Sequence, residues 1–248
     1  MRITITMSCC LAVMIMSVAM LSQPAEATVI TPTFVTGTIA GDAGSHVNYL
    51  ITDNAGFPEA ALQRPAGTGV TLNTGDTLAD ALATLHARNG QAHAESWTRS
   101  TGAGNPVFSF DLGADTSVGS VILWQYGNGS PGNSARDFEL IFHTAAEGNT
   151  FSFASGGGSE ATEFSGQMDQ AANYTTATNV AQFFGFGSTE NARYIGLRLA
   201  SNYNGILNPG GDRYGLGEVR FATEVPEPAT IFIMMAAGIP ALLKRKRK

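Results

Sequence analysis

The chain has 248 residues and a formal net charge of −6, with 14 lysines and arginines against 20 aspartates and glutamates. The last five residues are all cations and Arg2 is another, so residues 28–224 hold eight arginines, no lysine and eighteen carboxylates, a balance of −10. This acidity excludes nucleic-acid binding by phosphate neutralisation, which needs a basic face. The lack of lysine in the same stretch excludes Schiff-base and P-loop chemistry there.

The N-terminus has the parts of a secretory signal peptide. Arg2 precedes an apolar run at residues 9–21, and Ala25 and Ala27 are the small residues that signal peptidase recognises. We therefore expect residues 1–27 to be removed on export. A buried N-terminal helix, the alternative, would need a cap and a polar face, and this segment has neither. Both cysteines lie in this segment, so the exported part has none for a disulfide.

Residues 28–224 are predicted to form one domain of short strands with one helix. Leu78, Leu82 and Leu85 recur at helical spacing behind Asp76 or Thr77 as N-cap, which predicts the helix. Alternating or continuous apolar segments, separated by Gly, Asn, Ser and Pro, predict strands at 108–112, 118–126, 137–143, 195–199 and 219–221. Many strands, one helix and no βαβ alternation predict an all-β protein, a β-sandwich.

Five segments carry a family resemblance: FSFDLG from Phe108, VGSVILW from Val118, RDFEL from Arg136, ARYIGLR from Ala192 and YGLGEVRF from Tyr214. In this order they resemble the strands of a discoidin-like domain, the galactose-binding-like jelly roll that is also called the coagulation factor type C domain. The resemblance covers about residues 33–221. It implies a discoidin-like jelly-roll β-sandwich. The stretch 144–184 is longer than the family needs and has no predicted role.

Ligands of this fold usually contact loops at one end of the sandwich, where aromatic rings stack on sugars and polar side chains bind hydroxyls. The candidate ligand-binding residues are Trp97, Arg99, Tyr126, Asn128, Arg136, Asn202, Tyr203, Asn204, Arg213 and Tyr214. Tyr203, in the polar sequence SNYNG, is the strongest single candidate. Trp97 and Trp124 have an alternative place in the core.

A structural calcium ion is implied by the resemblance. In discoidin-like carbohydrate-binding relatives, calcium joins an early turn to a glutamate of the last strand, which corresponds here to Asp53 and Glu218. Carboxylate and carbonyl oxygens are the ligands that calcium prefers. Alternatively, Glu218 faces solvent or pairs with an arginine. Of the four histidines, only His86 and His93 have a spacing that a helix could turn into a metal site, and Gly90 between them argues against it. We therefore expect no zinc and expect surface or rim positions for all four: His46, His86, His93 and His143.

No pattern in the chain predicts catalysis. Residues 127–132 spell G-x-G-x-x-G, but a strand follows where a dinucleotide site needs a helix, so the segment is predicted to be a loop. A G-x-S-x-G motif or comparable nucleophile signature is absent from the sequence. Carboxylate pairs such as Asp137 and Glu139 lie on one face of one strand, whereas a glycosidase needs two carboxyls across a sugar. We therefore expect a non-enzyme.

The C-terminus has three parts: Pro226, Glu227 and Pro228, an apolar stretch at 229–243, and a basic cluster at 244–248. This order resembles the PEP-CTERM sorting signal, which an exosortase reads. Fifteen helical residues reach about 22 Å, short of a hydrocarbon core of about 30 Å, so a permanent anchor would be marginal. The resemblance implies that residues 225–248 hold the chain in the membrane transiently, with the cations in the cytoplasm. A simple tail anchor with a basic stop-transfer end is the alternative.

These observations together predict an exported, exosortase-sorted protein of the cell surface or extracellular matrix. Its domain is predicted to be a non-catalytic carbohydrate-binding or adhesion module associated with exopolysaccharide. A matrix protein that assembles with copies of itself is one alternative, and a hydrolase of matrix glycans is a second.

Overall fold

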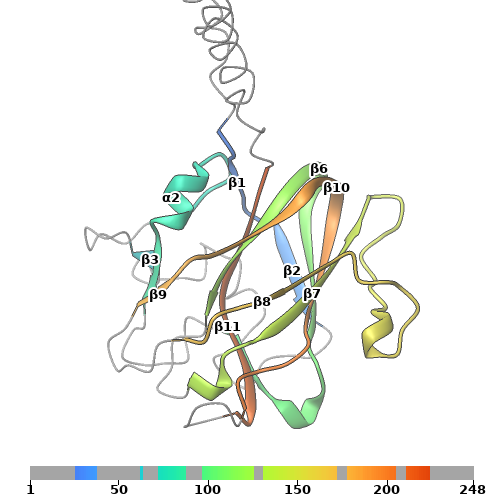
Figure 1. Ribbon diagram of the computed structural model, residues 1–248. Helices are drawn as coiled ribbons and strands as arrows, with labels where there is room; N and C mark the ends of the chain where they lie inside the picture. The colour runs from blue at the N-terminus through green and yellow to red at the C-terminus, as the bar shows by residue number, and fades with distance from the viewer. Residues whose placement is uncertain are drawn as a thin grey trace, which may run out of the picture. The chain divides into compact units, whose positions relative to one another are not determined.

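A computed structural model describes residues 26–37, 62–63, 72–87, 97–125, 131–171, 178–204 and 211–223. Its regular structure is mostly strand (Figure 1), and residues 28–224 form one compact unit. The strands are β1 (Val29–Ile30), β2 (Phe34–Gly37), β3 (Leu62–Gln63), β4 (Leu85–Ala87), β5 (Trp97–Ser100), β6 (Val107–Gln125), β7 (Asp137–His143), β8 (Phe164–Gln167), β9 (Thr178–Val180), β10 (Gln182–Leu199) and β11 (Arg213–Ala222). In this part of the chain, α2 (Leu78–Leu82) is the only α-helix, and η2 (Thr101–Ala103), η3 (Pro131–Asn133) and η4 (Ala154–Gly156) are short 3₁₀ turns.

Eight strands share one antiparallel sheet. Its order is β1-β11-β6-β10-β7-β8, with β2 also paired to β6 and β5 also paired to β11. A small second sheet has the order β3-β4-β9. The alternating segments of the sequence therefore form the strands that were predicted from them.

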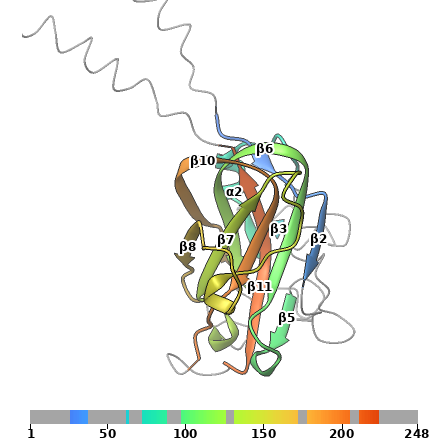
Figure 2. The ribbon, with the colours of Figure 1, turned by 90° about the vertical axis from the view of Figure 1, so that its right-hand side faces the viewer.

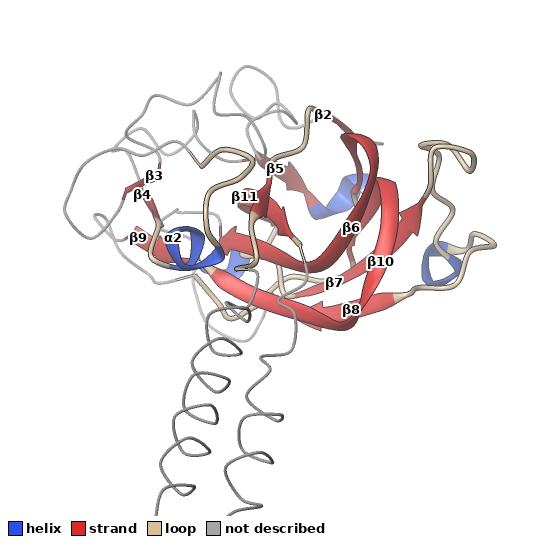
Figure 3. Cartoon of the chain, turned by 90° about the horizontal axis from the view of Figure 1, so that it is seen from above, coloured by secondary structure: helices blue, strands red, loops and turns tan. Residues whose placement is uncertain are grey.

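The large sheet forms two layers because its two longest strands bend. The first part of β6 pairs with the last part of β10, beside β2 and β7, whereas the last part of β6 pairs with the first part of β10, beside β11. The register of β10 against β6 breaks between Gly185 and Glu190 and again after Ala192. Figure 2 and Figure 3 show both strands curving through this region. The β-sandwich with one short helix is thus confirmed for the described residues.

The main core lies between the two layers. Phe110 of β6 meets Phe221 of β11 edge to face at 5.4 Å between ring centroids, and Phe138 of β7 meets Phe184 of β10 at 4.9 Å. On β6, Phe108 and Phe110 are buried while Ser109 between them is partly exposed, which confirms the period-two pattern. These aromatic pairs join strands from different layers and so hold the sandwich closed.

The helix α2 covers the opposite face of the last part of β6. Ile122 and Trp124 of β6 pack there with Ala81 of α2 and with Val29 and Leu72, in a second core cluster. Residues 118–125 are therefore buried on both faces, as their continuous apolar sequence predicted. The Trp124 Nε1–H donates to the Thr84 carbonyl at 3.0 Å, which fixes the end of the helix against the strand.

The helix is shorter than the leucine spacing predicted. Thr77 caps it, since its Oγ1 accepts from the Asp80 N–H at 3.0 Å and donates to Asp80 Oδ2 at 2.9 Å. Leu85 does not extend the helix but begins β4, whose pairing with β3 and β9 outweighs the helical spacing.

The two predicted end segments fall largely outside the described residues. The sorting tail at 225–248 and nearly all of the signal peptide at 1–27 therefore stay predictions. In the ranges that are described, no helix has the length and apolar character to cross a bilayer.

Candidate functional site

Most of the predicted ligand-binding residues lie at one end of the sandwich, which we call the loop end. It consists of residues 131–136, 201–204 and 211–213 together with the paired ends of β5 and β11 (lower part of Figure 1). A parallel bridge joins Ser134 to Gly215, and an antiparallel bridge joins Ala135 to Asn202. The loop end brings together seven of the predicted residues: Arg99, Arg136, Asn202, Tyr203, Asn204, Arg213 and Tyr214.

Arg136 and Tyr203 form the centre of the loop end. The Arg136 guanidinium carbon lies 5.9 Å from the centroid of the Tyr203 ring, a cation–π distance. The Tyr203 hydroxyl donates to the Met168 carbonyl at 2.5 Å, so the ring is held in place from below. The Arg136 side chain keeps 37% of its surface exposed. A guanidinium and an aromatic ring are therefore presented together at the surface.

The protonation states of Tyr203 and Asp137 determine the charge around Arg136. Burial, and then the nearby Asp169 carboxylate, raise the pKa of Tyr203, so its phenol stays a donor at neutral pH. Burial opposes ionisation of Asp137, but hydrogen bonds from Ser201 and Gln167 outweigh it, and the pKa of Asp137 lies below its ordinary value. Asp137 is thus an anion 3.8 Å from Arg136 Nε, and the pair has no net charge.

Asn202 shapes the loops of this end, whereas Asn204 is exposed. The Asn202 Nδ2 group donates to the carbonyls of Gly211 and Arg213 at 3.0 and 2.7 Å, which uses both of its N–H bonds. Gly211 has φ +113°, and a Cβ there would lie 2.6 Å from Asn204 Oδ1, so the crossing of these loops requires glycine. Asn204 is the amide of this pair that a ligand can reach.

Trp97 and Tyr214 are core residues in the structure. Trp97 is fully buried, with its ring edge to face with Phe108 at 4.8 Å, and Tyr214 is 7% exposed. The Tyr214 hydroxyl donates to Asn105 Oδ1 at 3.0 Å, and burial raises its pKa. The rings of these two candidates face the sandwich interior because each lies on β5 or β11 where those strands pair. For Trp97 this is the alternative that the sequence left open.

Three further candidates lie outside the described residues and stay predictions: Tyr126, Asn128 and Asp53. Glu218, the other half of the predicted calcium site, is fully buried on β11, where Arg220 Nη1 donates to its Oε1. Glu218 therefore pairs with an arginine, which is the alternative to a calcium site. The Arg220 guanidinium already neutralises the carboxylate that a calcium ion would need as a ligand. Within the described ranges, no group of three or more His, Cys, Asp or Glu side chains could hold a metal ion.

The expected surface or rim positions are wrong for the two histidines that the structure describes. His86 is 1% exposed and His143 is 8% exposed. His143 stacks on Phe151 with 4.4 Å between ring centroids, and its Nδ1 lies 3.0 Å from the Gly148 carbonyl oxygen. A flat ring with polar edges can pack and bond at once, which the sequence spacing of histidines does not reveal.

Two groups at the loop end were not predicted from the sequence. Met168 holds Tyr203 through its backbone carbonyl, and no side-chain pattern can reveal a carbonyl acceptor. The Ser201 hydroxyl donates to Asp137. Ser201 is the first residue of SNYNG, two positions before Tyr203, and this position was the signal in the sequence that could have indicated its role.

No protein-family model and no curated protein matches the chain. Several solved structures are similar to it. The family 32 carbohydrate-binding module of C. perfringens NanJ, solved with galactose, has 13% identity and a TM-score of 0.43, over 79% of this chain and 98% of that one. The lectin domain of Lectinolysin, solved with Lewis B antigen, has 13% identity and a TM-score of 0.45, over 79% and 96%. The family 32 module of Streptococcus pneumoniae EndoD has 10% identity and a TM-score of 0.41, over 79% and 99%.

Proposed function

We propose that this chain is an exported, non-catalytic carbohydrate-binding or adhesion module whose loop end contacts extracellular polysaccharide. The observation that carries the proposal is the partly exposed Arg136–Tyr203 pair beside the exposed amide of Asn204. An aromatic ring accepts the C–H face of a sugar, and guanidinium and amide groups bind its hydroxyls. The three groups lie on loops that a backbone bridge and the Asn202 hydrogen bonds join, which lowers the entropy lost on binding.

The end segments support an extracellular site of action. In this proposal signal peptidase removes residues 1–27, and the apolar segment 229–243 holds the chain transiently until an exosortase acts at Pro226, Glu227 and Pro228. The domain at 28–224 then remains at the cell surface or in the matrix with exopolysaccharide. A structural calcium at Asp53 and Glu218 stays a prediction within this proposal.

Retention of the purified full chain on immobilised exopolysaccharide tests the proposal. Tyr203→Ala is expected to weaken binding about fivefold or more, since loss of a central aromatic contact typically costs more than about 1 kcal/mol. Arg136→Gln is expected to weaken it in the same direction. Phe34→Ala is the matched control, because Phe34 is an aromatic residue with 63% exposure on β2, which does not belong to the loop end.

Two results would contradict the proposal. One is a parent chain that no polysaccharide retains. The other is retention that Tyr203→Ala and Arg136→Gln leave unchanged, which would remove the loop end as the contact surface.

A further inference from the structure

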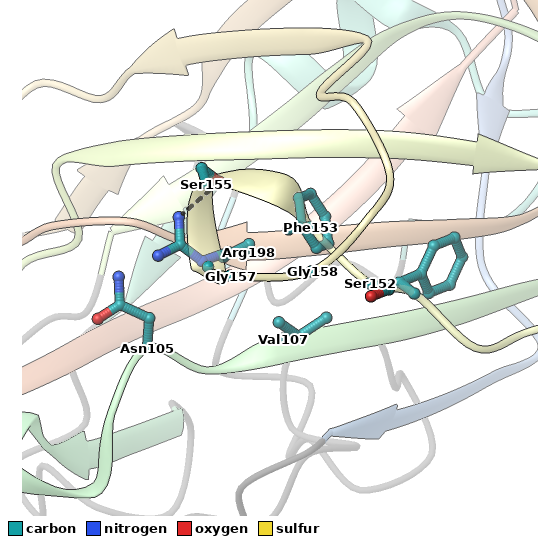
Figure 4. A pocket seen from close by; sticks show the side chains of 10 residues that line it. Asn105, Val107, Ser152, Phe153, Ser155, Gly157, Gly158 and Arg198 are labelled. Atoms are coloured by element: carbon teal, nitrogen blue, oxygen red, sulfur yellow. Dashed lines mark hydrogen bonds between the residues drawn. The ribbon is translucent and has the colours of Figure 1, made fainter.

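The segment between β7 and β8 borders an open pocket on the outer face of the sheet (Figure 4). Val107 of β6, Arg198 of β10 and Glu139 of β7 are cross-strand neighbours on that face. Residues 151–158 cross above them and leave a pocket of about 630 Å³, with Asn105 at its rim. This volume lies within the range of about 300–1,000 Å³ that is usual for small-ligand sites. The segment that had no predicted role thus builds a concave site.

We propose that this pocket binds one neutral pyranose unit of a polysaccharide, at a site separate from the loop end. The inference rests on the proposed carbohydrate-binding function and adds a second contact to it. The pocket is lined by residues 105, 107, 151–153, 155–158 and 198, and none of these belongs to the loop end as defined above.

Arg198 supplies the donors. Its side chain is only 11% exposed, and its Nη1 donates to Glu139 Oε2 at 2.9 Å and to Ser155 Oγ at 3.1 Å. Among the described residues, Nε and Nη2 of this guanidinium have no hydrogen-bond partner. Figure 4 shows one terminal nitrogen directed at Ser155 and the other toward the side on which Asn105 lies. Two adjacent donors in a fixed fork are suited to neighbouring oxygens of a sugar ring.

The charge of the site favours a neutral sugar. Glu139 accepts from both Arg198 and Ser155, so the guanidinium is already neutralised within the wall of the pocket. A second carboxylate, as in a uronic acid, would compete with Glu139 for Arg198 and gain little. Hydroxyl groups have no such conflict, because they accept from Nε and Nη2 without displacing the existing pair.

Phe151 and Asn105 complete the set of groups that recognise a pyranose. Phe151 packs against Gly196 of β10 and its ring stacks on His143, so these two contacts fix the ring at the pocket wall. The Asn105 amide is fixed by two bonds, from Nδ2 to the Ala200 carbonyl at 2.8 Å and from the Tyr214 hydroxyl to Oδ1. Its second N–H and second lone pair remain for a ligand.

The pocket continues along the sheet past Phe151. A second hollow of about 220 Å³ shares Val107 and Phe151 with the first and extends to Thr36 and Gly37 of β2. The two hollows are therefore neighbours on the outer face. Because a second unit has room beside the first, we expect internal units of a polymer chain as well as chain ends to bind.

NMR titration of the full chain with galactose, glucose, mannose and glucuronate tests this site. The Arg198 Nε–H signal reports the pocket, and the backbone amides of Arg136 and Tyr203 report the loop end. At least one neutral sugar is expected to shift the Arg198 signal, and glucuronate is expected to bind no more tightly. Arg198→Lys retains a cation beside Glu139 but lacks the fork, so we expect about tenfold weaker binding, followed at the backbone amides of Gly156 and Gly157, which line the pocket.

Gly156→Leu fills the pocket without removing a charge. A Cβ at Gly156 would lie 3.2 Å from Arg198 Nε, so the larger side chain is expected to abolish the Arg198 response. Ala154→Leu is the matched control, because Ala154 belongs to the same 3₁₀ turn, is exposed and does not line the pocket. If the chain retains polysaccharide but no sugar shifts the Arg198 Nε–H signal, the proposed pocket site is overturned and the proposed function is not. A parent chain that retains no polysaccharide would instead overturn the proposed function.

Discussion

Asp111 on the outer face of β6 is held by two parts of the chain. Arg193 of β10 donates from Nε to Oδ1 at 3.1 Å and from Nη2 to Oδ2 at 3.3 Å, and the Gly113 N–H donates to Oδ1 at 2.7 Å. The hydrogen bonds from Arg193 outweigh burial and hold the pKa of Asp111 below its ordinary value. The pair joins β6 to β10 beside the register break after Ala192, so it stabilises the bend between the two layers.

Asp111→Asn is expected to make the free energy of unfolding less dependent on pH in the acidic range. A depressed folded pKa stabilises the native state above the pKa of an unfolded aspartate, and this contribution is lost as the pH falls through the folded pKa. The parent should therefore be more stable than the variant at pH 6, and the two free energies of unfolding should converge below about pH 4. Denaturant titrations across this range measure the difference.

The matched variant for this pair is Arg193→Gln, which removes the same contact from the other strand. The pKa of Asp111, measured by NMR, should rise in this variant. An equal Asp111 pKa in the parent and in Arg193→Gln would contradict the role of the pair.

Individual candidate residues show what a sequence can and cannot predict. The loop residues that were expected to gather do so where the structure describes them, because antiparallel connections return to one end of a sandwich. The exposure of an aromatic residue is harder to predict. Trp97 and Tyr203 both stand among polar neighbours in the sequence, yet Trp97 is buried and Tyr203 is partly exposed. The difference arises from β5 pairing with β11, a contact between distant parts of the chain.

At the scale of elements, the segment 144–163 depends on a missing side chain in β10. A Cβ at Gly196 would lie 2.5 Å from the Cγ of Phe151, so only glycine lets the Phe151 ring approach the sheet. His143 and Glu160 then fasten the segment, with 3.3 Å between Nε2 and Oε1. The Ser152 N–H also donates to Glu160 Oε2 at 2.5 Å. The position and the pocket of this segment thus follow from one residue of the strand beneath it.

Gly196→Ala is expected to displace Phe151 and to destabilise the fold by about 1–3 kcal/mol, the usual cost of overpacking. Gly185→Ala on the same strand is the control, since a Cβ there would meet the nearest ring atom of Phe183 at an ordinary 3.4 Å. The control should change the free energy of unfolding by less than about 0.5 kcal/mol. Denaturant unfolding gives both values, and limited proteolysis reports whether residues 144–163 have loosened. Equal effects of the two substitutions would show that the Phe151 contact is not the cause.

The bends of β6 and β10 mark the limit of prediction from periodicity. The alternating stretch 108–112 and the apolar stretch 118–126 were predicted as two strands, but the structure joins them in β6, because residues 116–118 still pair with β10. A change from alternating to continuous apolar sequence therefore reports a change in which faces are covered. It does not report an end of the strand. The segment 144–163 has no regular spacing of apolar residues that would predict its structure. Its contact with Gly196 joins residues more than thirty positions apart in the sequence.

At the scale of the whole molecule, the described arginines leave little positive charge free. Four of them form ion pairs with carboxylates of the same domain, Arg136, Arg193, Arg198 and Arg220. Exposed carboxylates are spread over the surface at Asp115, Glu147, Glu163, Asp169 and Asp212. In the part of the domain that the structure describes, the acidic composition is therefore also a property of the surface. Such a surface repels anionic polymers at low ionic strength.

Association with an anionic polysaccharide is accordingly expected to require a divalent cation. At low salt the full chain should not be retained on alginate, and millimolar calcium should restore retention by bridging carboxylates of protein and polymer, with a chelator reversing the effect. Monovalent salt should relieve the repulsion only in part, since it screens charge but does not bridge. A neutral polysaccharide is the control, and its retention should not respond to calcium or chelator. Retention on alginate that persists in chelator at low salt would show that contacts at the loop end or the pocket overcome the repulsion unaided, and would refute the requirement for calcium.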